Sequence, residues 1–163
     1  MTLVLVAAGT VVVLDQITKA IALAHLAPGV PIHLVDGFLA LTLVMNAGLA
    51  FGLLGELPAA WRWIVALLSI VALMVLARVA VRVLADGGWL ARLSVALIFG
   101  GAVGNLIDRA RFGAVVDFVD AHYGGYHWPA FNVADSAITI GVALLALHLM
   151  LARPAAEAGR RQS

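Results

Sequence analysis

Residues 90–109, LARLSVALIFGGAVGNLIDR, hold the features from which the fold of the whole chain is predicted. This run is mostly apolar, has small residues at its centre and ends in a charged Asp-Arg pair. Gly100 and Gly104 are four positions apart, a spacing that lets helices approach closely in lipid. We therefore expect a central helix over about residues 90–108 that brings the ends of the other helices together.

The rest of the chain is as apolar as this run. Of its 163 residues, 64% are hydrophobic and 12% are charged, whereas a soluble domain is about 45–50% apolar and about 25% charged. A spanning helix needs about 20 mostly apolar residues. We predict an all-α membrane protein with a single domain over residues 1–163 and four transmembrane helices, at about residues 2–26, 60–84, 90–108 and 135–151.

The basic residues predict the orientation in the membrane, because they concentrate on the cytoplasmic side. Six of the ten flank the connection between the second and third helices or follow the fourth: Arg78, Arg82, Arg92, Arg153, Arg160 and Arg161. Both termini are therefore expected in the cytoplasm. In the outer segment 28–59, Asp36-Gly37 separates two mostly apolar runs, which is a hairpin signal. We expect a small extracytoplasmic β-element between helices one and two.

The carboxylates gather near one membrane surface. Ionisable side chains in lipid are costly, so they usually pair or serve a function. Asp15 lies about 20 Å along the first helix and thus in its outer half. The same level holds four more carboxylates and three amides, namely Asp108, Asp117, Asp120, Asp135, Asn46, Asn105 and Asn132.

Each of these groups, taken singly, also has a structural interpretation. The Asp-Arg pair that ends the third helix can be an interfacial ion pair, and Asp135 can cap the fourth helix. Asp15 and Lys19 are four positions apart and can pair with each other on one helix face. Solvated interfacial charges, however, need neither asparagine partners nor the apolar frame around Asp117, so the group as a whole favours an active site.

Five motifs, in order along the chain, resemble those of lipoprotein signal peptidases, the signal peptidase II family of aspartyl peptidases. They are Asp15-Gln16-Ile17-Thr18-Lys19, Asn46-Ala47-Gly48-Leu49-Ala50-Phe51-Gly52, Gly100 through Arg109, Val115-Val116-Asp117-Phe118 and Phe131-Asn132-Val133-Ala134-Asp135. Leu49 departs from the pattern, since a smaller residue is expected there, and we expect it to narrow the pocket slightly.

The resemblance implies a multi-pass protein of the bacterial cytoplasmic (inner) membrane, with its active site near the outer face. It implies cleavage of the signal peptide from diacylglyceryl-modified prolipoproteins just before the lipidated cysteine, and inhibition by globomycin. By motif it implies Asp117 and Asp135 as the catalytic pair. The implied substrate-binding residues are Asn46, Gly48, Asn105, Arg109 and Asn132, and the implied supporting residues are Asp15, Gln16, Lys19 and Asp108.

No cofactor and no catalytic metal is expected. Asp117-x-x-Asp120 suggests a divalent ion, but no clear histidine ligand pattern and no third carboxylate in register accompany it. His122 and His127 lie among aromatic residues and are interpreted as interfacial anchors. The glycines at 124 and 125 are interpreted as the hinge of a lid.

Other classes of protein fit the sequence less well. A proton-coupled carrier also places carboxylates in the membrane, but no inverted repeat is visible and the carboxylates lie at one surface. A structural anchor needs no clustered acids and amides, and a Mg²⁺-dependent lipid transferase needs a run of spaced aspartates that is missing. A net charge of +1 gives no indication of a nucleic-acid partner.

Overall fold

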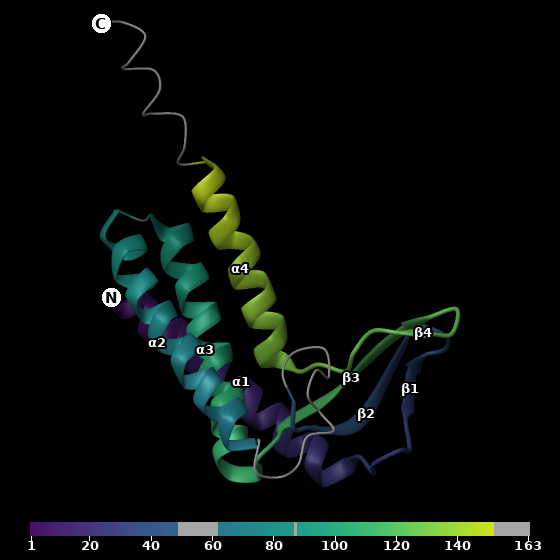
Figure 1. The fold of residues 1–163 in the computed structure, drawn as a ribbon. Helices are drawn as coiled ribbons and strands as arrows, with labels where there is room; N and C mark the ends of the chain where they lie inside the picture. Colours follow the sequence, from purple (N-terminus) through teal and green to yellow (C-terminus); the bar gives the residue numbers. More distant parts are fainter. Residues whose placement is uncertain (49–61, 87, 152–163) are drawn as a thin grey trace, which may run out of the picture.

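The structure is a computed structural model that describes residues 1–48, 62–86 and 88–151. Its helices are α1 (Thr2–His25), α2 (Arg62–Asp86), α3 (Trp89–Phe112) and α4 (Val133–Leu151). Its strands are β1 (Ile32–Val35), β2 (Leu39–Asn46), β3 (Val115–Tyr123) and β4 (Tyr126–His127). Figure 1 shows the helices gathered in one bundle and the strands extending sideways from one end of it.

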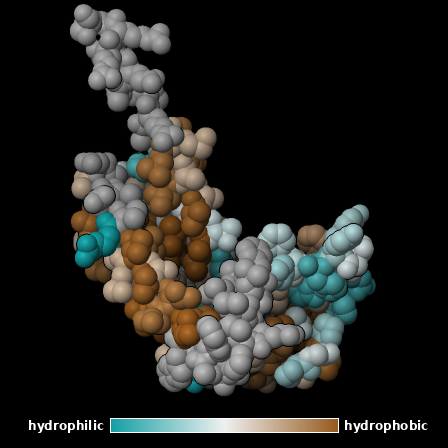
Figure 2. Space-filling model, in the orientation of Figure 1, coloured by the Kyte–Doolittle hydropathy of each residue, from teal (hydrophilic) through white to brown (hydrophobic). Residues whose placement is uncertain are grey.

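Three of the helices, α1, α3 and α4, are long and apolar enough to cross a membrane. Large apolar side chains of α1 and α4 are exposed, and Figure 2 shows hydrophobic surface over the helices. Such a surface fits a lipid environment. The fourth predicted span falls on α2, whose described apolar stretch is the shorter segment Leu67–Arg78.

The glycines of α3 allow the helices to pack closely, as the sequence predicts. A Cβ on Gly100 would lie 2.7 Å from the carbonyl oxygen of Ala8 in α1. A Cβ on Gly101 would collide with the carbonyl oxygen of Ala134 in α4. Side chains at these positions would push the neighbouring helices away. Because glycine has no side chain, α3 can pack closely against α1 and α4 at once. The prediction of a central helix is confirmed.

The strands form one antiparallel arrangement in the order β1-β2-β3-β4. β1 and β2 are joined at Asp36-Gly37, where Gly37 has a φ of +72°, so the predicted hairpin is confirmed. The other two strands come from the connection between α3 and α4, which the sequence analysis did not predict as strand. Asp117 lies on β3 and pairs with Val44 of β2.

α3 continues to Phe112, beyond the predicted end at residue 108. Gly113 ends the helix with a φ of +69°, and its N–H donates to the carbonyl oxygen of Arg109 at 3.0 Å. This left-handed conformation favours glycine. The reversal lets β3 begin two residues later, at Val115, beside the end of its own helix.

The close contact at Gly101 makes the Gly101→Ala substitution destabilising. Its Cβ would meet backbone of α4 that cannot move like a side chain, and overpacking of this kind costs about 1–3 kcal/mol. Gly9→Ala is the matched control, because a Cβ on Gly9 meets nothing within 4 Å. Thermal unfolding in detergent should show a lower midpoint for Gly101→Ala and none of that loss for Gly9→Ala. Equal midpoints would contradict the packing argument.

Candidate active site

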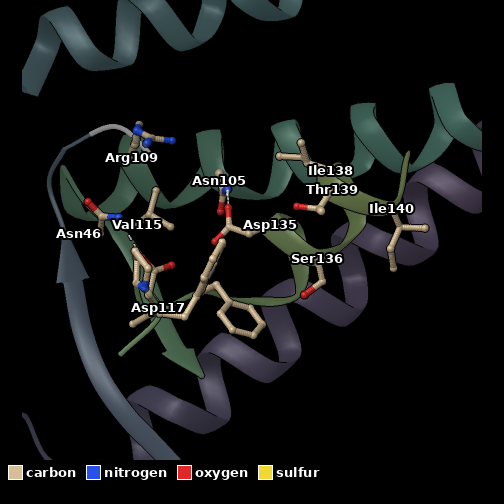
Figure 3. A pocket seen from close by; sticks show the side chains of 14 residues that line it. Asn46, Asn105, Arg109, Val115, Asp117, Asp135, Ser136, Ile138, Thr139 and Ile140 are labelled. Carbon is tan, nitrogen blue, oxygen red and sulfur yellow. Dashed lines mark hydrogen bonds between the residues drawn. The ribbon is translucent and has the colours of Figure 1, made fainter. Parts of the chain in front are cut away.

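An open cavity of about 630 Å³ lies where β2, β3, α3 and the start of α4 meet. Figure 3 shows its polar side chains converging from these elements. Its polar wall consists of Asn46, Asn105, Arg109, Asp117 and Asp135, and the remaining lining residues are Val115, Trp128, Pro129, Ala130, Phe131, Ser136, Ile138, Thr139 and Ile140. The volume is in the range of ligand pockets, which are mostly apolar with a few placed polar groups.

Asp117 projects from β3 and is 1% exposed. Both of its carboxylate oxygens accept hydrogen bonds from amides: Asn46 Nδ2 donates to Oδ2 at 3.0 Å, and Asn132 Nδ2 donates to Oδ1 at 2.7 Å. Burial raises the pKa of Asp117 to about 7, and the charge of Asp135 acts in the same direction. The two amide hydrogen bonds and the charge of Lys19 offset part of this rise in pKa.

Asp135 is held at the start of α4 by a reciprocal cap. Asn132 Oδ1 accepts the backbone N–H of Asp135 at 2.9 Å, and Asp135 Oδ2 accepts the backbone N–H of Asn132 at 3.2 Å. This arrangement is a capping box in which Asn132 is the cap, whereas the sequence analysis considered Asp135 for that place. The other oxygen of Asp135 accepts from Asn105 Nδ2 at 2.8 Å.

The segment before α4 brings the two acids to the same cavity. The backbone N–H groups of Phe118 and Val119 both donate to the carbonyl oxygen of Phe131, and Phe131 N–H donates back to Val119. This pairing places the cap of α4 beside β3. Asn132 then hydrogen-bonds to both Asp117 and Asp135, so one side chain sets the relative position of the two carboxylates.

Two of the predicted substrate-binding residues lie behind the cavity wall. Asn132 is fully buried and is absent from the cavity lining. Gly48 is also absent from that lining; its N–H donates to Asn46 Oδ1 at 3.1 Å, and its carbonyl oxygen accepts from Arg109 Nη2 at 3.1 Å. Among the described residues, Asn132 and Gly48 therefore contact side chains of the cavity wall, and Asn46, Asn105 and Arg109 line the cavity itself.

A buried ion cluster lies beneath the acids. Lys19 Nζ lies 2.8 Å from Asp15 Oδ2 and 2.7 Å from Asp108 Oδ2, and all three side chains are at most 3% exposed. Lys19 also donates to Asn105 Oδ1 at 2.9 Å. The pairing of Asp15 with Lys19 that the sequence allowed is confirmed. Asp108 pairs with Lys19, while its neighbour Arg109 lines the cavity.

The same carboxylates bind backbone and amide groups of other elements. Asp15 Oδ1 accepts the N–H of Ala134 in α4 at 2.9 Å, and Asp108 Oδ2 accepts the N–H of Val116 in β3 at 3.1 Å. Gln16 Nε2 donates to Asp108 Oδ1 at 2.9 Å. All four predicted supporting residues therefore meet in one network that joins α1, α3, α4 and β3.

The apolar wall of the cavity was not predicted from the sequence as part of the site. Part of it had a signal: Ile138 and Thr139 follow Asp135 by three and four positions, so on a helix they share its face. The residues from 128 to 131 had no comparable signal, because their place depends on the pairing of this segment with β3. Loop residues positioned by long-range pairing show no periodicity in the sequence.

A buried carboxylate, Asp117, and a half-buried one, Asp135, line one cavity beside helices able to cross a membrane. This arrangement is typical of a membrane peptidase of the aspartic class. The family described as signal peptidase (SPase) II matches residues 7–151. The chain therefore belongs to the signal peptidase II family, and it is a multi-pass membrane protein.

Curated relatives and solved structures agree with this assignment. The chain is 47% identical over 138 residues to a lipoprotein signal peptidase of Geobacter sulfurreducens, covering 85% of each chain. It is 48% identical over 147 residues to that of Desulforapulum autotrophicum, covering 86% of each. A solved bacterial membrane enzyme superimposes with a TM-score of 0.77 at 31% identity, covering 96% of this chain and 93% of the other.

The raised pKa of Asp117 predicts a pH-dependent stability. An aspartate has a pKa of about 3.9 in an unfolded chain, so between about pH 4 and pH 7 the folded chain retains a proton that the unfolded chain has released. The free energy of unfolding therefore falls as the pH rises through this range and levels off above it. Asp117→Asn removes this contribution, so its stability relative to the wild type should increase with pH.

Thermal unfolding of both chains from about pH 4.5 to about pH 8 measures this difference. Asp36→Asn serves as the control, because Asp36 is exposed in the β1–β2 turn. A difference between Asp117→Asn and wild type that stays constant with pH would contradict the prediction.

The ion cluster predicts a large loss of stability for Lys19→Met. Removal of the ammonium leaves two buried carboxylates without a counter-charge, and breaking a buried ion pair in this way costs about 3–5 kcal/mol. Arg92→Met is the matched control, since it removes a basic side chain that is exposed on α3. Chemical or thermal unfolding in detergent should separate the two variants clearly; a Lys19→Met chain as stable as Arg92→Met would show that the cluster contributes little.

Proposed function

We propose that this chain cleaves the signal peptide from diacylglyceryl-modified bacterial prolipoproteins, just before the lipidated cysteine, with Asp117 and Asp135 as the catalytic pair. The observation that carries the proposal is that both carboxylates line one cavity and that a single asparagine holds them together. Membership of the signal peptidase II family supports the same reaction.

The pair performs acid and base catalysis together. Two neighbouring carboxylates do not both ionise easily, so they share one proton and titrate as a unit. The ionised member accepts a proton from a water molecule, whose oxygen attacks the scissile carbonyl carbon. The neutral member donates its proton to the developing oxyanion. When the intermediate collapses, the C–N bond breaks and a proton passes to the leaving nitrogen, which becomes the new amino terminus.

The cavity walls bind the substrate on either side of the reacting atoms. Arg109, Asn46 and Asn105 present donors that satisfy the polar groups of an extended peptide in a site with little water. Ile138 and Ile140 supply apolar surface from α4, beside which the diacylglyceryl chains remain in the bilayer. The chemistry needs no metal and no cofactor, and globomycin, a cyclic peptide, is the inhibitor expected to compete for this cavity.

The proposal includes a topology. α2 is the fourth transmembrane helix, both termini are in the cytoplasm of the bacterial inner membrane, and the strands and active site lie near the outer face. The acids lie at the end of the bundle where the strands extend (Figure 1). In the sequence, six of the ten basic residues flank the α2–α3 connection or follow α4, which favours the cytoplasm for that side. The chain forms one domain over residues 1–163, since helices and strands share the buried ion cluster.

Cleavage by the reconstituted chain tests the proposal. Wild type in lipid should convert a diacylglyceryl-modified prolipoprotein to its mature form, and globomycin should block the conversion. Asp117→Asn and Asp135→Asn should each reduce the rate by at least about 10²–10⁴-fold, as expected for loss of a positioned acid or base. Asp36→Asn, a matched change at the exposed turn, should retain the rate.

The outcomes separate the parts of the proposal. If wild type cleaves and only one of the two variants loses activity, the assignment of the catalytic pair is wrong in its other member. If folded wild type does not cleave this substrate, the proposed reaction is wrong.

A further inference from the structure

A second cluster of ligating side chains lies farther along β3 than Asp117. Asp120 and His122 come from β3 and His127 from β4, and one ligand atom from each lies within 4.8 Å of the others. The label β4 in Figure 1 marks this place, at the end of the strands farthest from the helices. The proposed peptidase mechanism uses none of these three residues.

The strand pairing explains why the three side chains meet. Asp120 and His122 are two positions apart on β3 and so share one face, and His127 is the direct partner of His122 across the β3–β4 pair. Asp117 lies three residues before Asp120 on β3, where it pairs with Val44 instead of Ala40. The sequence shows no ligand pattern here, because His127 reaches the other two residues only when the chain reverses at Gly124-Gly125, where both residues have positive φ.

The distances suit a tetrahedral metal ion. His127 Nδ1 lies 2.9 Å from Asp120 Oδ1, and His122 Nδ1 lies 3.8 Å from Asp120 Oδ2. Ligands bound tetrahedrally at about 2.0–2.1 Å lie about 3.3 Å from each other. The two observed distances fall on either side of this value, and all three ligand atoms lie within 4.8 Å of one another.

The ring nitrogen Nδ1 of His122 is buried without a bonding partner among the described residues, although buried polar atoms are nearly always satisfied. This nitrogen is directed toward the same carboxylate that His127 contacts. A metal ion bound between them accepts the lone pair of this nitrogen and so removes the deficit.

A third histidine lies next to the cluster. His33 of β1 pairs with Ala40 of β2, which in turn pairs with Asp120, so the three residues lie in one row on one face. Ala40 is small and fully buried, which leaves room above it for imidazole rings. The ring centroids of His33 and His122 are 6.1 Å apart, so His33 lies next to the cluster.

We propose that Asp120, His122 and His127 bind a divalent transition-metal ion such as Zn²⁺, with water or His33 in the fourth position. Imidazole ligands with one carboxylate favour zinc and its neighbours over Mg²⁺ or Ca²⁺. Figure 2 shows hydrophilic surface at this end of the strands, so the ion reaches the site from water. Bound there, the ion links β4 to β3 and holds the end of this hairpin.

Metal binding by the complete, tag-free chain in detergent tests the proposal. After treatment with a chelator, titration with Zn²⁺ followed by calorimetry should give one ion per chain, and Co²⁺ should give the visible absorption of a tetrahedral site. Asp120→Asn and His127→Gln should each weaken Zn²⁺ binding at least ten-fold. His25→Gln is the matched control, because His25 is exposed on α1 and contacts the carbonyl oxygen of Ile21 in the same helix.

The variants at Asp120 and His127 keep the metal-site proposal testable. The side chains of Asp120 and His127 are 15% and 59% exposed, so these variants should fold even if His122→Gln does not. Absence of saturable one-to-one binding would overturn the proposal, and so would an equal loss of binding in His25→Gln and His127→Gln. The readout is metal binding, so its failure leaves the proposed peptidase activity untouched.

Discussion

The ammonium of Lys19, buried between the carboxylates of Asp15 and Asp108, is the interaction on which the rest of the structure depends. Removing three charged groups from water is costly and is repaid only when each has partners at close range. Those partners come from α1, α3, α4 and β3. The cluster is therefore satisfied only when all four elements are in place, so it couples the packing of the helices to the position of β3.

The cluster also determines how the catalytic acids are held. Asn105 donates to Asp135 through its amide nitrogen and accepts from Lys19 through its oxygen. The acids are thereby oriented by neutral amides, while the buried ammonium of Lys19 pairs with two other carboxylates, Asp15 and Asp108. A cation in direct contact with Asp117 would lower its pKa strongly. Amide donors fix the geometry and leave the pKa of Asp117 at about 7, where a shared proton is available at neutral pH.

Local patterns in the sequence predicted the helices that span, the glycine packing of α3 and the β1–β2 hairpin. They also selected all five residues of the polar cavity wall, because charged and amide residues are few in an apolar chain. What they did not predict depends on pairing between distant segments. β3 and β4, the buried position of Asn132 and the meeting of His122 with His127 all follow from strand register, which a short sequence pattern does not specify.

The register of β3 decides which of its residues face the cavity. Successive side chains of a strand point to opposite faces, so a slip by one residue would turn Asp117 away and present Phe118 in its place. Two contacts, one on each side of Asp117, oppose this slip. The Asp108 carboxylate accepts the N–H of Val116 just before Asp117, and the Phe131 carbonyl oxygen accepts the N–H of Phe118 just after it. The first contact leads back to Lys19 and the second to the cap of α4. The ion cluster and the helix cap thus fix the register of β3 on both sides of Asp117. Its carboxylate is therefore held at one position, facing the cavity.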